Sequence, residues 1–299
     1  GRGAGARVTA AEEGSRVAAA GSARASWRLR RLTGLAFLLF PFTLYWEQRR
    51  VIVTLVRTQI ARRNRRSLLG WVWNLIQPGT QAMVLFFATR GAIQVPSTES
   101  TLAGFGIFFA AQIIAQGMGE IVGRGPMLVI ERPGWVKGSL FPLELLSPMA
   151  VGVTLYRVVP GGALGILCVL LGAGPAVAAG LTATFVVALV LAVMWATALA
   201  LAFSAVGVYL RDAVFLAPII TLGLTFISPL YVDPKADGLM ALGRDINPLT
   251  VSMHLILEGF GWLAAHPVHA VLGLLAPFLG LWAAGWLFRR ASALFADFV

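Results

Sequence analysis

The sequence predicts an all-α integral membrane protein. Apolar residues make up 58% of its 299 residues, and charged residues only 12%. Several apolar runs reach about 20 residues, the length that a helix needs to cross a hydrocarbon layer of about 30 Å. These runs lack the alternation of apolar and polar residues expected of an outer-membrane barrel. We therefore expect an amphipathic interfacial helix near the N-terminus, six transmembrane helices, and short re-entrant helices on the outer side before the last span.

Positive charge is concentrated in the N-terminal part of the chain. The formal net charge is +11, and residues 1–66 contain fourteen arginines against three glutamates, a difference that accounts for all of it. A positive block ahead of the first span predicts a cytoplasmic N-terminus. Nucleic-acid binding is the competing interpretation, but arginines beside a span more often contact anionic lipid heads. We therefore expect membrane lipids, and no nucleic acid, as partners.

Residues 1–46 are predicted to form a disordered or interfacial tail. Residues 1–26 lack the apolar core of a signal peptide, and the apolar stretch 32–46 is short and interrupted by Pro41. Residues 47–66 predict an amphipathic helix in the membrane plane, because apolar and polar residues segregate at helical spacing. Its apolar face comprises Ile52, Leu55, Val56 and Ile60, opposite Arg50, Thr54 and Arg57. The arginines assigned to this interfacial segment are Arg57, Arg62, Arg63, Arg65 and Arg66.

Residues 47–290 are predicted to form the transmembrane domain, and residues 291–299 a cytoplasmic C-terminal tail. The six spans are expected over about residues 68–89, 102–122, 141–171, 176–209, 213–232 and 268–288. Basic residues fall mainly in the connections that this order places inside, so both termini are expected in the cytoplasm. In the outer stretch 233–267, the turn signal Asn247-Pro248 and the apolar periodicity after it predict one or two short helices. Irregular backbone at membrane depth requires protein or water around it.

Motifs for nucleotides and metals are missing from the sequence. There is no G-x-x-x-x-G-K-[ST] to cradle phosphates, so ATP and Mg²⁺ are expected to bind to another chain if they drive transport. Cys168 is the single cysteine, which excludes a disulfide within one chain. The three histidines lack the spacing of a zinc site. We expect no catalytic residue, metal or cofactor in this chain.

The inner loop between the second and third spans is the best candidate for a contact with another protein. Pro126 can start a short helix, and Pro133 prevents its continuation. A helix of this size suits a lever that presses into a groove of a soluble subunit. A passive cytosolic turn is the alternative interpretation. The candidate residues are Met127, Leu128, Val129, Ile130, Glu131 and Arg132.

Polar and aromatic residues on the predicted first span suggest a path for a polar substrate. Asn74, Gln77 and Gln81 recur at helical spacing, and such a stripe is expected to face protein or a wet channel. Trp71 and Trp73 could stack on sugar rings, because a ring presents C–H faces to an aromatic side chain. Ordinary anchoring at the membrane interface is the alternative for both tryptophans.

Charged residues within the predicted spans are costly in hydrocarbon and usually face a partner or a cavity. Arg157 could line a conduit for acidic or polar glycan, or it could neutralise a carboxylate on a neighbouring helix. It would lie nearer the inner side if the third span began later than residue 141. Glu120 and Arg124 are four residues apart at the inner end of the second span and could pair on one helix face.

Five sequence elements, in order over about residues 47–290, resemble those of type-2 ABC exporter permeases in the branch that exports O-antigen, teichoic acid and capsule chains. They are Leu69-Gly70-x-x-Trp73-x-x-x-x-Pro78 after a run of arginines, Phe141-Pro142-Leu143-Glu144-Leu145-Leu146-Ser147-Pro148, Tyr209-Leu210-Arg211-Asp212, Ile227-Ser228-Pro229 and Asn247-Pro248-Leu249. The resemblance implies that the inner loop carries a coupling helix, which docks on a cytosolic ABC ATPase dimer. It also implies that two copies of this chain form the pore.

The function implied by the resemblance is the permease subunit of an exporter that moves lipid-linked polysaccharide across the bacterial inner membrane, powered by a separate ATPase. An exporter of a drug, haem precursor or small lipid is the nearest alternative. A membrane-bound glycosyl- or phosphotransferase would need clustered acidic residues near the inner face, where the connecting loops offer Glu131 and Asp212 far apart in sequence. A secondary transporter or channel is a further alternative, although no inverted repeat is apparent.

Overall fold

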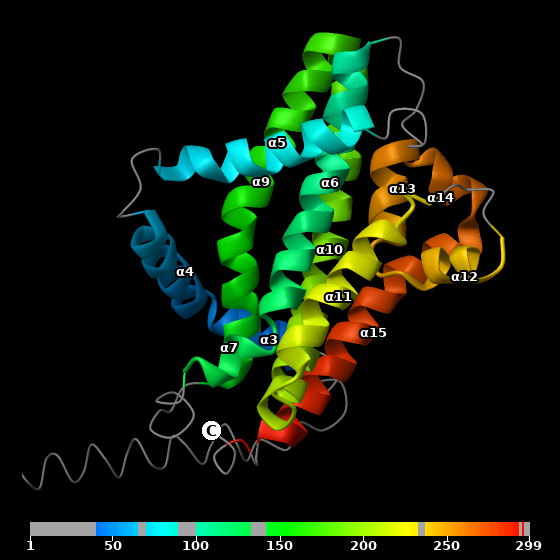
Figure 1. Ribbon diagram of the computed structural model, residues 1–299. Helices are drawn as coiled ribbons and strands as arrows, with labels where there is room; N and C mark the ends of the chain where they lie inside the picture. The colour runs from blue at the N-terminus through cyan, green and yellow to red at the C-terminus, as the bar shows by residue number, and fades with distance from the viewer. Residues whose placement is uncertain are drawn as a thin grey trace, which may run out of the picture.

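The computed structural model describes residues 40–64, 70–88, 100–132, 142–232, 237–292 and 295. All regular secondary structure in these residues is helical (Figure 1). The prediction of an all-α integral membrane protein is confirmed. What the sequence predicts for residues 1–39 lies outside the described residues.

Four helices in the described part of the chain are long and apolar enough to cross a membrane. They are α6 (Thr101–Arg124), α9 (Leu146–Ala173, after the 3₁₀ turn η2 at Leu143–Leu145), α10 (Pro175–Tyr209) and α15 (Pro267–Ser292). Their positions agree with the second, third, fourth and sixth predicted spans. The most apolar window of α6 is 83% buried, against 22% for α15. α6 is therefore the central helix, and its polar side chains face other helices.

The core is tightest where α6 meets α9. Gly106 and Gly165 let the two backbones touch, since a Cβ built on Gly165 would lie 2.8 Å from the carbonyl oxygen of Gly106. A residue with a side chain at either position would push the helices apart. This contact fixes α9 against one side of α6 and leaves the other sides of α6 for α5, α10 and α11.

The two remaining predicted spans form shorter helices. α5 (Trp73–Ala88, after the 3₁₀ turn η1 at Gly70–Val72) has 16 residues, and α11 (Ala213–Phe226) has 14. At the rise of an α-helix these lengths are about 24 Å and about 21 Å, less than the hydrocarbon layer of about 30 Å. The apolar sequence of the fifth predicted span continues to residue 232, but Pro229 cannot extend the helix.

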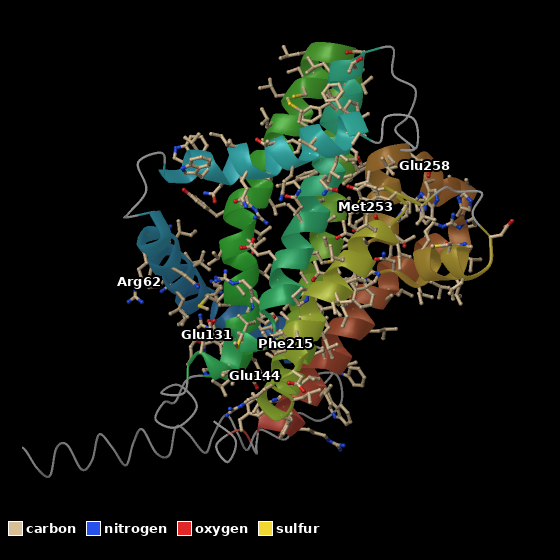
Figure 2. The ribbon with its side chains drawn as sticks, viewed as in Figure 1. Arg62, Glu131, Glu144, Phe215, Met253 and Glu258 are labelled. Atoms are coloured by element: carbon tan, nitrogen blue, oxygen red, sulfur yellow. The ribbon has the colours of Figure 1, made fainter. Side chains whose placement is uncertain are left out.

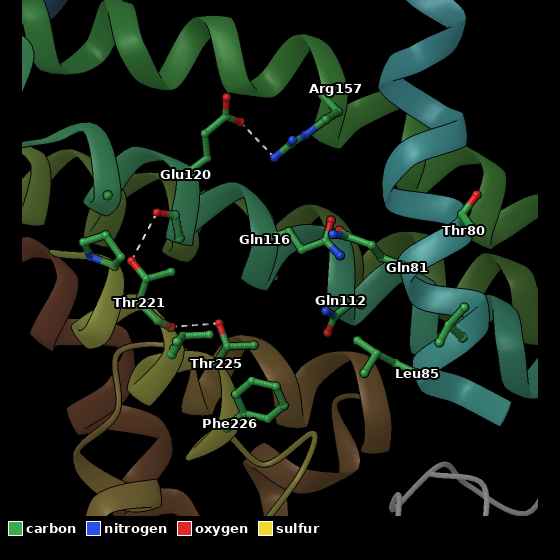
Figure 3. A pocket seen from close by; sticks show the side chains of 15 residues that line it. Thr80, Gln81, Leu85, Gln112, Gln116, Glu120, Arg157, Thr221, Thr225 and Phe226 are labelled. Atoms are coloured by element: carbon green, nitrogen blue, oxygen red, sulfur yellow. Dashed lines mark hydrogen bonds and ion pairs between the residues drawn. The ribbon is translucent and has the colours of Figure 1, made fainter. Parts of the chain in front are cut away.

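The orientation of α5 also differs from that of the long helices. α5 crosses α6 at a steep angle instead of running along it (Figures 1 and 3). Its buried residues are Pro78, Ala82 and Phe86, four apart, so α5 touches the bundle along one narrow stripe. Only the second half of α5 lies over α6 and α11. For this reason only polar residues from that half can face the cavity between these helices.

The amphipathic helix predicted over residues 47–66 is present as α4 (Arg49–Asn64), which follows α3 (Phe40–Glu47). The four residues of its predicted apolar face are partly buried, and the three residues of its predicted polar face are exposed. α4 packs on α9 at Gly152, where a Cβ would lie 2.7 Å from Cγ2 of Val56. The apolar residues that predicted this helix are therefore the ones on its more buried side, and one of them, Val56, packs against α9.

The outer stretch before the last span contains three short helices in its described part, where one or two were predicted. They are α12 (Leu239–Ile246), α13 (Thr250–Glu258) and α14 (Gly261–Ala265). α13 is buried from Thr250 to Leu257, and the hydroxyl of Ser252 donates a hydrogen bond to the carbonyl of Ala188 on α10 over 3.1 Å. The side-chain amide of Asn247 donates to the carbonyl of Leu224 over 2.7 Å. Protein thus surrounds α13, as polar backbone at membrane depth requires, whereas α12 has no buried residue.

Candidate functional site

The inner loop forms a short helix at one end of the bundle. α7 (Met127–Ile130) begins directly after Pro126, and Glu131 lies near this end together with Glu144 (Figure 2). Leu128 and Val129 are buried, whereas Glu131 is exposed. The predicted coupling segment therefore packs inward at Leu128 and Val129 and remains accessible at Glu131. The guanidinium of Arg132 donates to the carbonyl of Leu128 over 2.8 Å and closes the end of the helix.

The loop that leads into α7 rests directly on α10. A Cβ on Gly125 would lie 2.7 Å from Cβ of Phe203, and a Cβ on Gly207 would lie 2.6 Å from Cα of Pro126. At Gly207 no side chain separates α10 from the backbone of the loop, and at Gly125 the nearest atom of α10 is the Cβ of Phe203, which a change of rotamer does not move. We call this contact, made by Gly125, Pro126, Phe203 and Gly207, the α7 seat. α7 cannot shift relative to α10 without opening it.

A second contact at the same end of the bundle as α7 joins the start of α9 to the end of α15. Glu144, from the Phe-Pro-Leu-Glu element, is buried, and its Oε1 lies 3.7 Å from Nε of Arg289. The hydroxyl of Tyr209 donates to the carbonyl of Ala291 over 2.8 Å. These contacts hold the inner ends of α9, α10 and α15 together beside the α7 seat.

The predicted interfacial arginines are described in part. Arg57 and Arg62 are exposed on α4, and Arg62 points away from the bundle (Figure 2). The side chain of Arg63, and Arg65 and Arg66 entirely, lie outside the described residues. The two described side chains are thus exposed on α4, and their contact with lipid heads stays a prediction.

A cavity of ≈ 850 Å³ lies between α5, α6, α9 and α11 (Figure 3). Its volume is within the range of about 300–1,000 Å³ typical of ligand sites. The polar residues that line it are Thr80, Gln81, Gln112, Gln116, Glu120, Arg157, Thr221 and Thr225. The side-chain-bearing apolar residues that line it are Val84, Leu85, Pro218, Leu222 and Phe226.

The structure brings two of the six predicted substrate-path residues into this cavity. Gln81 and Arg157 line it, although they are 76 positions apart in the sequence. The other four, Trp71, Trp73, Asn74 and Gln77, belong to the first turns of α5 or to η1, and none of them lines this cavity. Trp71 and Trp73 are 52% and 50% exposed. The reason is the steep crossing of α5, which carries its first turns beyond the edge of the cavity.

An ion pair lies at one end of the cavity. Nη2 of Arg157 is 2.8 Å from Oε2 of Glu120, so Arg157 lines the cavity and meets a carboxylate from a neighbouring helix at the same time. Nη1 of Arg124 is 3.7 Å from Oε1 of Glu120, which is the pair that the spacing on the second span suggested. Nε of Arg157 is buried without a hydrogen-bond acceptor among the described residues. It can donate to water or to a bound ligand.

Hydrogen bonds fix the direction of several polar groups around the cavity. The hydroxyls of Thr80, Thr221 and Thr225 donate to the backbone carbonyls of residues 76, 119 and 221, over 2.8, 3.3 and 3.0 Å. Tyr231 donates its hydroxyl to Oε1 of Gln112 over 2.9 Å. The threonine oxygens therefore remain as acceptors, and the amide NH₂ of Gln112 remains as a donor.

The sequence contained a signal for the residues that were missed. Gln112, Gln116 and Glu120 are four apart on α6, a helix that is otherwise almost wholly apolar over this stretch. Thr221 and Thr225 have the same spacing on α11. The polar stripe that we predict from the sequence is on the first predicted span alone. The same test applied to the second and fifth spans would have found these five residues.

Metal chemistry has no arranged ligands in the part of the chain that the structure describes, where no group of three or more His, Cys, Asp or Glu side chains is placed to hold an ion. His254 instead has its Nδ1 2.6 Å from Oε1 of Glu258. Its ring stacks on Trp262 with the ring centroids 4.4 Å apart. These side chains join α13 to α14, in the segment that the sequence predicts on the outer side.

The comparisons with known proteins gave one family match. Residues 50–260 match the family described as ABC-2 type transporter. The match covers more than half of the chain, and it includes α7, the α7 seat and all residues that line the cavity. A comparison with curated proteins found no match.

Proposed function

Because this chain belongs to the ABC-2 type transporter family, we propose that it is the permease of an exporter that moves lipid-linked polysaccharide outward across the bacterial inner membrane. Family membership makes it a transmembrane subunit of an ABC exporter and a multi-pass membrane protein. The chain is not itself the catalytic subunit, and membership of this family implies an ABC ATPase as its partner. We propose three further properties: the polysaccharide cargo, the homodimer, and the cytoplasmic location of both termini.

The polar lining of the cavity is the observation that carries the choice of cargo. Amides, hydroxyls and an ion pair line a space between helices that are otherwise apolar. Such groups are costly in hydrocarbon and usually face a partner or a water-filled path. A chain of sugars presents many hydroxyls, each able to donate and to accept a hydrogen bond. A polysaccharide therefore suits this lining better than a lipid-soluble drug does.

The inner end of the molecule supports coupling to a separate ATPase. Glu131, directly after α7, is exposed and offers a point of docking, while the α7 seat joins the start of the same helix to α10. Closure of a cytosolic ATPase dimer, which would bind the ATP and Mg²⁺, would push on α7 and α10 together. Transport then requires the ATP-loaded dimer to prefer one arrangement of the permease over the other. Two copies of this chain would supply the two halves of the pore.

Co-purification tests the coupling. The tagged permease is expected to recover a stoichiometric ATP-hydrolysing subunit, and replacement of residues 127–132 by a Gly/Ser linker is expected to abolish that recovery. The matched control replaces six residues of the outer helix α12, residues 240–245, by the same linker and should retain the ATPase. Recovery that survives the first replacement would contradict the assignment of α7.

Deletion of the gene tests the cargo. Loss of surface polysaccharide with unchanged drug susceptibility is the expected result. The apolar residues of the cavity, such as Leu222 and Phe226, keep an exporter of drugs or small lipids as the second candidate. Unchanged polysaccharide together with altered drug susceptibility would favour that candidate and contradict our choice.

A further inference from the structure

We propose that the cavity takes a neutral, polyhydroxylated segment of glycan and discriminates against an acidic one. This inference rests on the proposed export of a glycan and specifies its chemical class. The sequence left acidic and neutral glycans open, because an isolated Arg157 could attract uronate or phosphate groups. Two features of the cavity decide between them: the pairing of its charges and the direction of its hydrogen-bonding groups.

The two charged side chains that line the cavity have opposite signs and are paired. Among the described residues that line it, Glu120 and Arg157 are the charged ones, and their side chains are 2.8 Å apart. Both side chains are mostly buried, with exposed fractions of 19% and 14%. Nε of Arg157 has no acceptor among the described residues, but an anionic ligand could reach it only beside the carboxylate of Glu120. It could reach Nη2 only by breaking the ion pair. Both routes are unfavourable because the two side chains are mostly buried, so that water screens them poorly.

The hydrogen-bonding groups of the cavity also disfavour an anion. The three threonines have donated their hydroxyl hydrogens to backbone carbonyls, so their oxygens can only accept. Gln112 offers its NH₂ as a donor, since Tyr231 occupies its oxygen, and Gln81 and Gln116 carry amides that can both donate and accept. A carboxylate or phosphodiester offers acceptors alone, and these would face the threonine oxygens without a proton between them. A sugar hydroxyl can donate to the threonines and accept from the amides.

The position of these groups suits a polymer that passes through the cavity. Figure 3 shows the ion pair at one end and Phe226 toward the other, with the amides of Gln81, Gln112 and Gln116 between them. The ring of Phe226 can lie against the C–H face of a sugar. The uncharged polar groups therefore fill the middle of the cavity, where a repeating unit would lie.

Binding of two matched oligosaccharides tests the inference. The probes are fluorescent maltohexaose, which is neutral, and fluorescent hexagalacturonate, which is acidic and of equal length, both added to the permease–ATPase complex in lipid nanodiscs. Wild-type protein should bind maltohexaose more tightly. Glu120→Gln leaves the charge of Arg157 uncompensated and should shift the ratio of the two affinities toward hexagalacturonate by about tenfold at low salt. Added salt should reduce the shift.

Two further variants separate charge from damage to the fold. The double variant Glu120→Gln/Arg157→Gln removes both charges and should keep the neutral preference of the wild type. Gln81→Lys adds a positive charge on the exposed face of α5 while the ion pair stays intact, and it should shift the ratio in the same direction as Glu120→Gln. Retention of the co-purified ATPase shows that each variant is assembled.

The outcomes are distinct for the inference and for the proposed function. Tighter binding of hexagalacturonate by the wild type, or a ratio that neither charge variant changes, overturns the inference while leaving glycan export intact. Binding of neither probe, together with unchanged surface polysaccharide after gene deletion, overturns the proposed function itself. A polysaccharide that is lost on deletion and contains no uronate or phosphate in its repeating unit supports the inference.

Discussion

The α7 seat and the cavity differ in what lies between their helices. At the seat, Gly125 and Gly207 bring the backbone of the loop directly against α10. In the cavity, side chains on four helices surround ≈ 850 Å³ of space. A contact between backbones has no rotamers with which to adapt, whereas side chains around a space can change conformation. The comparison suggests that α7 and α10 move as one unit, while the cavity can adjust to the cargo inside it.

The largest effect is expected from Gly207→Leu, which tests whether the seat is rigid. A side chain at this position would overlap the backbone of Pro126, and backbone cannot move aside as a flexible side chain can. Overpacking typically costs about 1–3 kcal/mol, and a backbone neighbour places this change at the upper end. We expect α7 to leave α10, with surface polysaccharide and the recovered ATPase both reduced about tenfold or more. Quantification of both checks the prediction.

Gly180→Leu is the matched control for that substitution. Gly180 lies on the same helix, and a Cβ there would have no atom within 4 Å. Export and ATPase recovery should therefore stay near those of the wild type. An equal loss of export and ATPase recovery in both variants, or full activity of Gly207→Leu, would contradict the prediction that the α7 seat is more rigid than the rest of α10.

The second effect is expected from Arg157→Leu, which tests how dry the cavity is at its charged end. The substitution leaves the carboxylate of Glu120 mostly buried, with Nη1 of Arg124 3.7 Å from its Oε1. Removing one partner of a buried pair costs roughly 3–5 kcal/mol, and the residual exposure here lowers our expectation to about 2 kcal/mol. Thermal unfolding of the purified complex measures the loss.

The double variant Glu120→Leu/Arg157→Leu should be more stable than Arg157→Leu, because it removes the carboxylate as well. A double-mutant cycle gives the interaction between the two side chains. An interaction near zero would mean that water screens the pair, and that the charges of the cavity act independently on a ligand.

The long helices could be predicted from the sequence because they need no information about their neighbours. α6, α9, α10 and α15 follow from apolar runs of sufficient length, and their bounds lie within a few residues of those expected. α7 followed from Pro126 and Pro133, which act locally. The direction of α5 could not be predicted in this way, because its contact with α6 depends on the shape of a surface formed by other helices.

The cavity could be predicted in part. Gln81 was found from the polar stripe on its own helix, whereas the partner of Arg157 lies 37 positions away on α6. Spacing shows that Gln112 shares a face with Glu120, but it does not show which helix meets that face. The role of Gly207 could not be predicted, because a glycine in an apolar helix is not distinctive in sequence. Its role becomes clear only when the loop before α7 lies against it. Contacts between distant segments are what the sequence pattern omits.

A smaller effect is expected from Tyr231→Phe, which tests whether the direction of the Gln112 amide matters. The change removes the hydroxyl that donates to Oε1 of Gln112 and lets the amide turn over. One hydrogen bond contributes about 1 kcal/mol, so binding of maltohexaose should weaken about fivefold with little change in ATPase recovery. In a Gln112→Leu background the same substitution should have no further effect on binding. An undiminished effect there would mean that Tyr231 acts on the cavity through packing and not through Gln112.

The smallest effect is expected from Trp71→Ala combined with Trp73→Ala, which tests the boundary of the cavity. Both side chains are about half exposed, at 52% and 50%, and neither lines the cavity. Substitutions of exposed residues usually change stability by less than about 0.5 kcal/mol, so export should stay near that of the wild type. By contrast, Gln81→Ala in α5 should weaken maltohexaose binding. Loss of interfacial anchoring would lower polysaccharide export and ATPase recovery together, because it would act on the position of α5 as a whole. Loss of maltohexaose binding alone would instead extend the sugar path to the start of α5, and the space available to the cargo would then be larger than the cavity between the four helices.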